Sequence, residues 1–316
     1  MNTTFASLEQ ASGLPSRPLH LAIGMFDGVH LGHRAVIEAA VQSARRSGGL
    51  AAVLTFFPHP NTLFRPEAPT RLIMPPATKA RVLFQLGVEA VIEQPFTAEF
   101  AHITAEEFLP YVRRALPRLA GIYVGENWRF GRDRRGDVPF LVAEGRRVGL
   151  GVFSADRVSY DGEPISSTRI RALLEAGDVA AANTLLGYTY FAEGTVTRGA
   201  GLGRTFGFPT LNLGWEPELQ PRFGVYLVRV AGPGSSASFP AVANYGVRPT
   251  IGSSAHPRLE SHVLGPCPFG EGDVLTVEWL RFLRPEQKFA GPEALRAQIG
   301  RDVASARAEF GLASAE

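Results

Sequence analysis

The change of pattern near residue 188 is the feature that most constrains how this 316-residue chain can fold. Before it, apolar segments with the character of buried strands alternate with segments of helical periodicity. That order is typical of a parallel sheet covered by helices. After it, short segments rich in Val, Phe, Tyr and Leu are separated by Gly and Pro, which favours an antiparallel sheet or barrel. We therefore expect two domains, residues 1–187 and 188–316, in line with the chain length.

The first half contains apolar runs typical of strands that are buried on both faces. We expect strands at residues 19–23, 51–57, 88–92 and 121–125. We expect helices from about residue 35 and at residues 78–86, 105–115, 168–176 and 178–186. Gly177 and Gly187 end the last two, because glycine suits a helix C-cap. The pattern indicates a Rossmann-like α/β domain, in which ligands bind at the carboxyl ends of the strands.

The second half predicts an antiparallel β-barrel followed by a terminal helix. Its expected strands cover residues 190–196, 225–230, 241–245, 258–264 and 274–282, and its expected helix covers about 292–310. We expect the apolar side of that helix to pack against the barrel. At the other end of the chain, residues 1–16 have neither the basic start nor the apolar core of a signal peptide. We expect them to form a loose extension.

The basic residues are almost all arginine, since only Lys79 and Lys288 among the 32 Lys and Arg residues are lysine. Neither lysine follows a glycine, so the Gly-Lys-Ser/Thr sequence of a Walker-type phosphate loop is absent. Any ATP must therefore be held by histidines, arginines and backbone N–H groups. The formal net charge of +2 is too small to indicate a nucleic-acid groove, and we expect small-molecule partners.

The number of cysteines and the length of the apolar runs indicate the cellular compartment in which the chain works. Cys267 is the single cysteine, so no internal disulfide can form, which fits a reducing cytoplasm. No apolar run reaches about 18 residues, so we expect no membrane span. The sequence leaves open whether the chain forms a homo-oligomer.

Residues 24–33 read Gly-Met-Phe-Asp-Gly-Val-His-Leu-Gly-His and lie between an expected strand and an expected helix. A helix N-terminus presents unpaired N–H groups and a partial positive charge, which suits a phosphate. His30 and His33 are three apart and share a helix face, where both imidazoles can donate hydrogen bonds to a triphosphate. Gly28 and Gly32 would let a ligand approach the backbone. The alternatives are a surface pair, a helix cap, or a zinc pair, for which further soft ligands are lacking.

This stretch resembles the His-x-Gly-His signature of nucleotidyltransferases. Its longer form is similar to the prokaryotic bifunctional riboflavin kinase/FMN adenylyltransferases, also called FAD synthetases. Residues 55–60, 125–131 and 165–171 resemble the later nucleotide-binding motifs of that family, in the family's order. The resemblance implies catalytic roles for His30, His33 and Arg171. It implies ATP or flavin binding by Gly24, Phe26, Asp27, Gly28, His59, Asn127, Ser166, Ser167, Thr168 and Arg169.

Each of these later motifs also has a plain structural interpretation. His59 lies between two prolines, which would hold it in a rigid turn with or without a ligand. Trp128 and Phe130 can offer a ring to a flavin or to adenine, but we expect one of them in the core. Arg169 and Arg171 lie about 200° apart on a helix. We therefore expect only one of them, Arg171, to face the phosphates.

The most specific motif of the second half is the glycine-rich segment 199–208 followed by Pro-Thr-Leu-Asn at 209–212. On a strand, Thr210 and Asn212 point to one face, where a hydroxyl and an amide oxygen suit Mg²⁺ bound with ATP phosphates. The segment resembles the nucleotide and magnesium motif of riboflavin kinases. Glu260 matches that family's catalytic glutamate, although an exposed strand carboxylate is the ordinary alternative. The resemblance also implies binding roles for Gly201, Gly203, Arg204, Thr205, Asn244, Arg284 and Glu286.

The resemblance spans about residues 19–310 and implies a bifunctional enzyme. The barrel would phosphorylate riboflavin to FMN, and the first domain would transfer AMP from a second ATP to FMN, giving FAD and pyrophosphate. Both steps would use Mg²⁺. Two alternatives stay open: a single-activity nucleotidyltransferase with a non-catalytic barrel, and a flavin-binding regulator without turnover. The sequence departs from the family's usual pattern at Met25, Leu211 and Tyr245, and in the segment Gly187-Tyr188-Thr189-Tyr190, where Gly-Arg-Pro-Tyr is usual.

Overall fold

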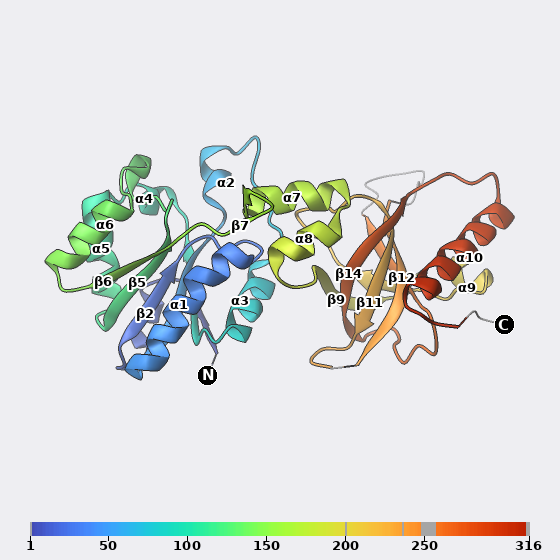
Figure 1. Cartoon of the computed structure of the whole chain (residues 1–316), viewed down its shortest axis with the longest axis horizontal. Coiled ribbons are helices and arrows are strands. Elements are labelled where there is room, and N and C mark those ends of the chain that lie inside the picture. Colours follow the sequence, from blue (N-terminus) through green and yellow to red (C-terminus); the bar gives the residue numbers. More distant parts are fainter. Residues whose placement is uncertain (1, 200, 236, 248–256, 314–316) are drawn as a thin grey trace. The chain divides into compact units, whose positions relative to one another are not determined.

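The computed structural model describes residues 2–199, 201–235, 237–247 and 257–313. The chain forms two compact units, Met1–Ser167 and Thr168–Glu316 (Figure 1). Helices α7 (Ser167–Ala176) and α8 (Val179–Leu186) fall almost entirely in the second unit, although the sequence pattern assigns them to the first domain. The functional boundary between residues 187 and 188 stays a prediction.

A six-stranded parallel sheet forms the centre of the first unit. Its strands are β1 (Thr3–Phe5), β2 (Leu19–Ile23), β3 (Leu50–Phe57), β4 (Ala90–Pro95), β5 (Leu119–Gly125) and β6 (Gly151–Ala155). They are ordered β1-β4-β3-β2-β5-β6, and every pair is parallel. The predicted parallel sheet is thus confirmed, with the fully buried β2 next to β3 on one side and β5 on the other. A separate hairpin joins β7 (Ser159–Tyr160) to β8 (Glu163–Pro164).

Helices cover this sheet and bury its apolar faces (Figure 1). They are α1 (Leu31–Ser47), α2 (Pro60–Phe64), α3 (Pro76–Gln85), α4 (Ala98–Ala101), α5 (Ala105–Ala115) and α6 (Val138–Arg147), with 3₁₀ turns at Gln10–Gly13 and Arg132–Arg134. Helix α1 packs against β2, β3 and β5. Helix α5 begins with a capping box, in which Thr104 and Glu107 each accept the other's backbone N–H.

The N-terminal segment is not the loose extension expected from the sequence, so that prediction was wrong. Strand β1 pairs in parallel with β4 and places Thr4 opposite Val91. Leu8 and Ala11 are fully buried in the core of the sheet. The backbone N–H of Leu8 donates to Oε1 of the buried Gln94 at 2.9 Å. Isolated apolar residues anchor the segment, and such a short pattern predicts neither a strand nor a helix.

The second unit contains a closed antiparallel barrel, as the sequence predicts. Its strands are β9 (Phe191–Thr197), β10 (Leu211–Gly214), β11 (Gly224–Ala231), β12 (Ser238–Gly246), β13 (Arg258–Val263) and β14 (Val274–Pro285). They close in the order β10-β13-β12-β11-β14-β9, and closure leaves no strand edge exposed. The short helix α9 (Leu202–Thr205) follows β9. Helix α10 (Pro292–Glu309) packs against the barrel as predicted, with Ala306 buried among Val225, Leu227 and Val242.

The pair of helices before the barrel has the glycine ends that the sequence predicts. Gly177 and Gly187 directly follow α7 and α8 with φ values of 87° and 74°. Asn183 ties α8 to the barrel, because its Nδ2 donates to the carbonyl of Trp279 at 2.8 Å. Its Oδ1 accepts the backbone N–H of Tyr190 at 2.7 Å.

Aromatic side chains fill the inside of the barrel. Tyr190, Tyr226, Tyr245 and Trp279 are buried, and the ring of Trp279 lies 6.0, 4.4 and 5.5 Å from the three tyrosine rings. Burial raises the pKa of the Tyr226 and Tyr245 hydroxyls well above the ordinary value. Successive strand residues point to opposite faces, so Asn244 points out of the barrel where Tyr245 points in. Tyr245, where this sequence differs from the usual pattern of the resembled family, therefore lies in the barrel core.

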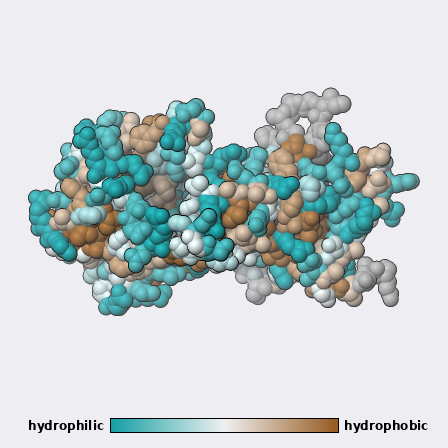
Figure 2. All heavy atoms as spheres, turned by 45° about the horizontal axis from the view of Figure 1, so that its top comes forward, coloured by the Kyte–Doolittle hydropathy of each residue, from teal (hydrophilic) through white to brown (hydrophobic). Residues whose placement is uncertain are grey.

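The face shown in Figure 2 is mainly hydrophilic and is interrupted by small apolar areas. Exposed large apolar side chains include Phe64 on α2 and Tyr160 on β7. Within the described residues, no helix is long and apolar enough to cross a membrane.

Candidate active sites

The first candidate site lies at the carboxyl edge of the parallel sheet. The turn at residues 24–30 follows β2, the segment 58–59 follows β3, and the segment 126–130 follows β5. Because β3, β2 and β5 are adjacent and parallel, all three segments leave the sheet at the same edge. The strand order changes direction at β2, which is where open α/β sheets bind ligands.

His30 and His33 are brought together at the start of α1. His30 is the N-cap, and its Nδ1 accepts the backbone N–H of His33 at 3.3 Å. The two imidazoles stack with centroids 3.5 Å apart and an interplanar angle of 18°. Since Nδ1 of His30 accepts a hydrogen bond, the proton of its neutral ring sits on Nε2. His30 therefore caps the helix, and the proton of its neutral ring lies on the other nitrogen, so the cap is compatible with the predicted role toward a phosphate.

His59, which follows β3, caps a helix in the same way as His30. It is the N-cap of α2, and its Nδ1 accepts the backbone N–H of Asn61 at 3.1 Å. The preceding Phe57–Pro58 peptide bond is cis. Because Nδ1 of His59 accepts a hydrogen bond, the neutral ring carries its proton on Nε2, as in His30. Its predicted role in binding stays a prediction.

The turn that leads to His30 is shaped by buried contacts. Phe26, Gly28 and Val29 have φ values of 50°, 79° and 39°, so two residues with a Cβ adopt the left-handed region. The buried ring of Phe26 meets that of His33 edge-on at 5.3 Å. A Cβ on Gly24 would lie 3.0 Å from the Phe26 ring, so a side chain at this position would crowd the buried ring.

Asp27 is almost completely buried and holds the turn to the segment before α3. Its two carboxylate oxygens lie 3.0 and 3.1 Å from the backbone N–H of Ile73. The Oγ of Ser167 donates to the carbonyl of Asp27 at 2.9 Å, which joins the fourth predicted motif to the first. Ser166 lies beside it and is half-buried. Thr168, Arg169 and Arg171 lie on α7 in the second unit, and their roles stay predictions.

The motif after β5 divides between core and surface. Phe130 is buried in the core, as expected for one of its two aromatics. Trp128 is half-buried and stacks on Phe130 with centroids 4.6 Å apart and an angle of 16°. Asn127 is exposed, and its Nδ2 donates to Oε1 of Glu126 at 3.3 Å. Of Asn127, Trp128 and Phe130, Asn127 is therefore the one whose side chain is exposed to solvent.

The second candidate site lies on the outer face of the barrel, and strand register builds it. Asn212 pairs with Glu260 between β10 and β13, and Glu260 pairs with Asn244 between β13 and β12. Val225 continues the row, since it pairs with Asn244 on one side and Arg284 on the other. Directly opposed residues in antiparallel strands point to the same face. Residues far apart in the sequence therefore form one row of neighbouring side chains.

A cavity of about 310 Å³ opens over this row and contains Thr210, Glu260 and Asn244. Asn212 next to Glu260 is buried, and its Oδ1 has no hydrogen-bond partner among the described residues. Gly199 packs so closely on the Asn212 amide that a Cβ would lie 2.3 Å from Nδ2. An unpaired buried oxygen is costly, which makes this atom a candidate ligand contact, and the metal role of Asn212 stays a prediction.

The glycine-rich segment forms one wall of the same cavity. Gly201 adopts φ 74° and is the N-cap of α9, and Gly203 lines the cavity. A Cβ on Gly203 would lie 2.4 Å from the carbonyl of Phe208, so a side chain would not fit there. Arg204 and Thr205 are exposed on α9. Their binding roles stay predictions.

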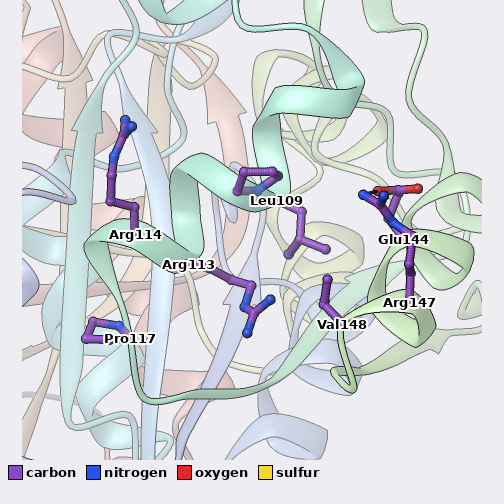
Figure 3. A pocket seen from close by; sticks show the side chains of 8 residues that line it. Leu109, Arg113, Arg114, Pro117, Glu144, Arg147 and Val148 are labelled. Carbon is purple, nitrogen blue, oxygen red and sulfur yellow. Dashed lines mark hydrogen bonds and ion pairs between the residues drawn. The ribbon is translucent and has the colours of Figure 1, made fainter.

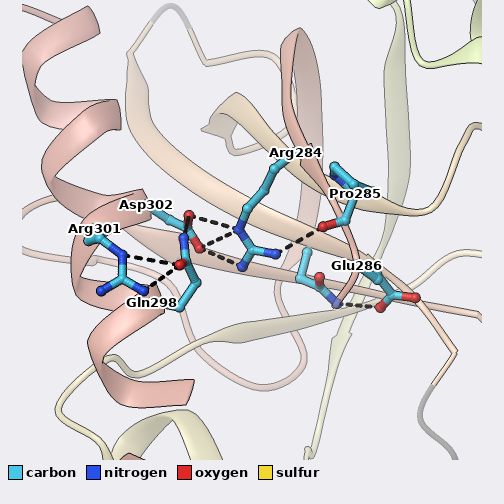
Figure 4. Close-up of polar contacts among 7 residues, drawn as sticks. Arg284, Pro285, Glu286, Gln298, Arg301 and Asp302 are labelled. Atoms are coloured by element: carbon cyan, nitrogen blue, oxygen red, sulfur yellow. Dashed lines mark hydrogen bonds and ion pairs between the residues drawn. The ribbon is translucent and has the colours of Figure 1, made fainter. Parts of the chain in front are cut away.

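Arg284 and Asp302 form a largely buried ion pair at the other wall (Figure 4). Nη2 of Arg284 lies 2.6 Å from Oδ2 of Asp302, and Nε lies 2.9 Å from Oδ1. Gln298, one turn earlier on α10, donates to the same carboxylate at 2.9 Å. The pair joins the end of β14 to α10. Asn244 donates to Glu286 at 3.4 Å, which brings two predicted binding residues together.

The polar residues that sequence reasoning missed at this site include His262, Asp302 and Gln298, which donates to Asp302. His262 lines the cavity, and its Nδ1 donates to the carbonyl of Pro209 at 2.8 Å, directly before Thr210. Its position two residues after Glu260 on a strand was a usable signal, because both side chains share a face. Asp302 had no local signal, since its partner lies on a different element.

A second cavity, of about 400 Å³, lies between the C-terminal ends of α5 and α6 (Figure 3). Leu109, Arg113, Arg114, Glu144 and Arg147 are among its lining residues. Arg147 pairs with Glu144 at 2.7 Å. None of the predicted site residues lies there. Arginines in the last turn of a helix have an ordinary role, because they offset the negative end of the helix dipole.

Comparison with known proteins gives a family match for each of the two parts of the chain. Residues 15–169 match the family model described as FAD synthetase, and residues 186–310 match the one described as riboflavin kinase. The bifunctional riboflavin kinase/FMN adenylyltransferase of Escherichia coli K12 is 37% identical over 306 residues, which cover 96% of this chain and 97% of that protein. The protein of the same name from Pseudomonas fluorescens is 38% identical over 301 residues, covering 92% and 94%.

The chain belongs to the bifunctional riboflavin kinase/FMN adenylyltransferase family. The FAD synthetase part of the family corresponds to the parallel-sheet unit, and the riboflavin kinase part corresponds to the barrel with α10. A solved structure from Streptococcus pneumoniae, named a macrolide-efflux protein, has a TM-score of 0.85 and 29% identity, covering 97% of this chain and 98% of that one. That name describes the other protein, and the likeness supports the fold.

Proposed function

We propose that this chain makes FAD from riboflavin in two ATP-dependent steps, one in each unit. The observation that carries the proposal is the row Asn212–Glu260–Asn244 on the barrel, of which Glu260 and Asn244 line the cavity, together with the paired histidines of the parallel-sheet unit. The first arrangement suits phosphoryl transfer from ATP, and the second suits the binding of a triphosphate. Family membership supports both activities.

In the kinase step, Glu260 would accept the proton of the ribityl 5′-hydroxyl of riboflavin. The freed oxygen forms a bond to the γ-phosphorus of ATP, the bond from that phosphorus to the bridging oxygen breaks, and ADP leaves with the electron pair. A carboxylate beside the hydroxyl contributes general base catalysis. The glycine-rich wall with Gly203 would let ATP phosphates approach the backbone. The products are FMN and ADP.

The residues Thr210 and Asn212 fit Mg²⁺. The buried Oδ1 of Asn212 has no hydrogen-bond partner among the described residues, and Asn212 pairs with Glu260, which lines the barrel cavity together with Thr210. A magnesium ion in such sites takes few protein ligands and completes its shell with phosphate oxygens and water. When bound, the ion would neutralise charge on the ATP phosphates. We propose Mg²⁺ for both steps.

In the adenylylation step, a phosphate oxygen of FMN would form a bond to the α-phosphorus of ATP. The bond from that phosphorus to the bridging oxygen breaks, and pyrophosphate leaves. Nε2 of His30 and the ring of His33 would donate hydrogen bonds to the phosphate oxygens as charge develops. Arg171 would stabilise the leaving pyrophosphate. Positioning and electrostatics suffice, so no covalent enzyme intermediate is required.

The chain itself, incubated with riboflavin and Mg-ATP, tests this function directly. Separation of the products is expected to show FMN first and then FAD with pyrophosphate. Turnover of supplied FMN without any turnover of riboflavin would identify a single-activity nucleotidyltransferase with a non-catalytic barrel. Binding of flavin without either product would identify a regulator. We further propose a reducing cytoplasmic setting because Cys267 is the single cysteine, and we propose no nucleic-acid partner because the net charge is only +2.

A further inference from the structure

Lys79 is an unusual residue in this chain. It is one of two lysines among 32 basic residues, and it lies on α3 with only 4% of its surface exposed. A buried cation is costly unless specific partners hold it. Methionine would fill the same space without this cost, so the amine must be explained by what it contacts.

The amine of Lys79 contacts the start of the turn that carries the paired histidines. Its Nζ donates to Oγ1 of Thr55 at 2.8 Å and to the carbonyl of Met25 at 3.2 Å. Oγ1 of Thr55 in turn donates to the same carbonyl at 2.9 Å, and Thr55 is fully buried. The three groups form a closed triangle in which the Met25 carbonyl accepts two hydrogen bonds. This buried triangle fixes the orientation of the peptide that precedes Phe26.

The backbone after that peptide is strained, which makes its orientation important. Phe26 and Val29 have positive φ although both carry a Cβ. Such a conformation is unfavourable for a residue with a Cβ and persists only where its surroundings hold it. His30 follows Val29 directly and caps α1. A shift of the Met25 carbonyl would therefore be passed on to both imidazoles.

The charged neighbours of Lys79 are two carboxylates. Burial lowers the pKa of Lys79, and the carboxylates of Asp27 and Glu93 act in the opposite direction. Asp27 belongs to the same turn and holds it to Ile73. An amine donates N–H groups in either charge state, so the brace on Met25 does not depend on the charge of Lys79.

We propose that Lys79 is a positioning residue of the adenylyltransferase site, which holds the Met25 carbonyl so that the following turn presents His30 and His33 to the phosphates of ATP. The proposal rests on the proposed function of that turn. It also accounts for how a turn with Met25 is braced, since the backbone carbonyl of that residue receives the hydrogen bonds.

The first test is the substitution Lys79→Met, assayed for conversion of FMN to FAD at varied ATP. We expect kcat/KM to fall by at least about tenfold, because a displacement of about 1 Å in a site can cost about a hundredfold. We also expect the KM for ATP to rise. A smaller folded fraction would lower the maximal rate and leave that KM unchanged. Riboflavin kinase activity is expected to stay within about twofold, since it belongs to the other unit.

The matched control is Arg81→Met, which removes an exposed cation from the same helix and should leave both activities unchanged. Should Lys79→Met fail to fold, Thr55→Val removes the second donor to Met25 with almost no change of volume. We expect that variant to lose about threefold or more in adenylylation. Wild-type adenylylation kinetics in either folded variant would overturn the proposal.

A double-mutant cycle with His33→Ala separates positioning from general stability. If Lys79 acts through the histidines, Lys79→Met should cost less in the His33→Ala background than in the unchanged chain. Equal costs in both backgrounds would contradict the proposal. The unchanged chain distinguishes the two claims: if it makes no FAD from FMN, the proposed function fails, whereas normal FAD formation by Lys79→Met refutes the role of Lys79 alone.

Discussion

The two sites hold their functional side chains by different means. In the parallel-sheet unit, His30, His33 and His59 lie in turns and helix caps just beyond strand ends. In the barrel, Asn212 and Glu260 lie on the strands themselves and meet through register. A turn site depends on local backbone conformations and on the buried groups that brace them. A register site depends on long-range strand pairing, which places side chains without any strained backbone.

We expect the largest effect from a substitution that disables the barrel site alone. Glu260→Gln keeps the shape of the side chain and removes the base from the kinase step. We expect the rate of FMN formation from riboflavin and ATP to fall by about a thousandfold. Conversion of supplied FMN to FAD should stay within about twofold, as measured by product separation. Equal loss of both activities would mean that the two sites are not separate.

The corresponding change in the turn site is His33→Ala. It removes one imidazole of the stacked pair and a hydrogen-bond donor to the developing phosphate charge. We expect adenylylation to slow by about a hundredfold, so that the reaction from riboflavin stops at FMN. Riboflavin kinase activity, measured on the same sample, is the internal control. Continued FAD production at the original rate would contradict a role for the histidine.

The smallest expected effect concerns how α10 is held to the barrel. Asp302→Asn leaves Arg284 without its carboxylate, and both side chains are largely buried. We expect a loss of about 2 kcal/mol in the stability of the barrel unit and a weaker riboflavin kinase. Urea unfolding can be followed by tryptophan fluorescence, to which Trp215 and Trp279 of the barrel contribute.

Glu309→Gln is the matched control for Asp302→Asn. It breaks the pair of Arg281 with Glu309, in which both side chains are more than a third exposed. An exposed pair contributes little, so we expect a change below about 0.5 kcal/mol. Equal destabilisation by both variants would show that burial does not distinguish the two pairs.

The turn site could be predicted from sequence because its parts are local. The strand β2, the glycine-containing turn and the helix α1 with His30 at its cap follow one another directly in the sequence, and each has its own pattern. The brace from Lys79 could not be predicted in this way. It lies on another helix, and only its rarity among the basic residues marked it.

The register site could be predicted only in part. Alternation along a strand put Thr210 and Asn212 on one face, but their position beside Glu260 required pairing of strands that are distant in sequence. The contact of Arg284 with Asp302 depends on how α10 docks on the barrel, which no local pattern specifies. The same limit explains the missed β1, whose three residues are stabilised by pairing with β4.

The central claim is that two separate sites act in series, and mixing two variants tests it most directly. Glu260→Gln should make almost no FMN from riboflavin, and His33→Ala should convert almost none of its FMN to FAD. Mixed together with riboflavin and Mg-ATP, they are expected to produce FAD, because FMN released by one chain serves as substrate for the other. Absence of FAD from the mixture, while each variant keeps its remaining single activity, would contradict the account.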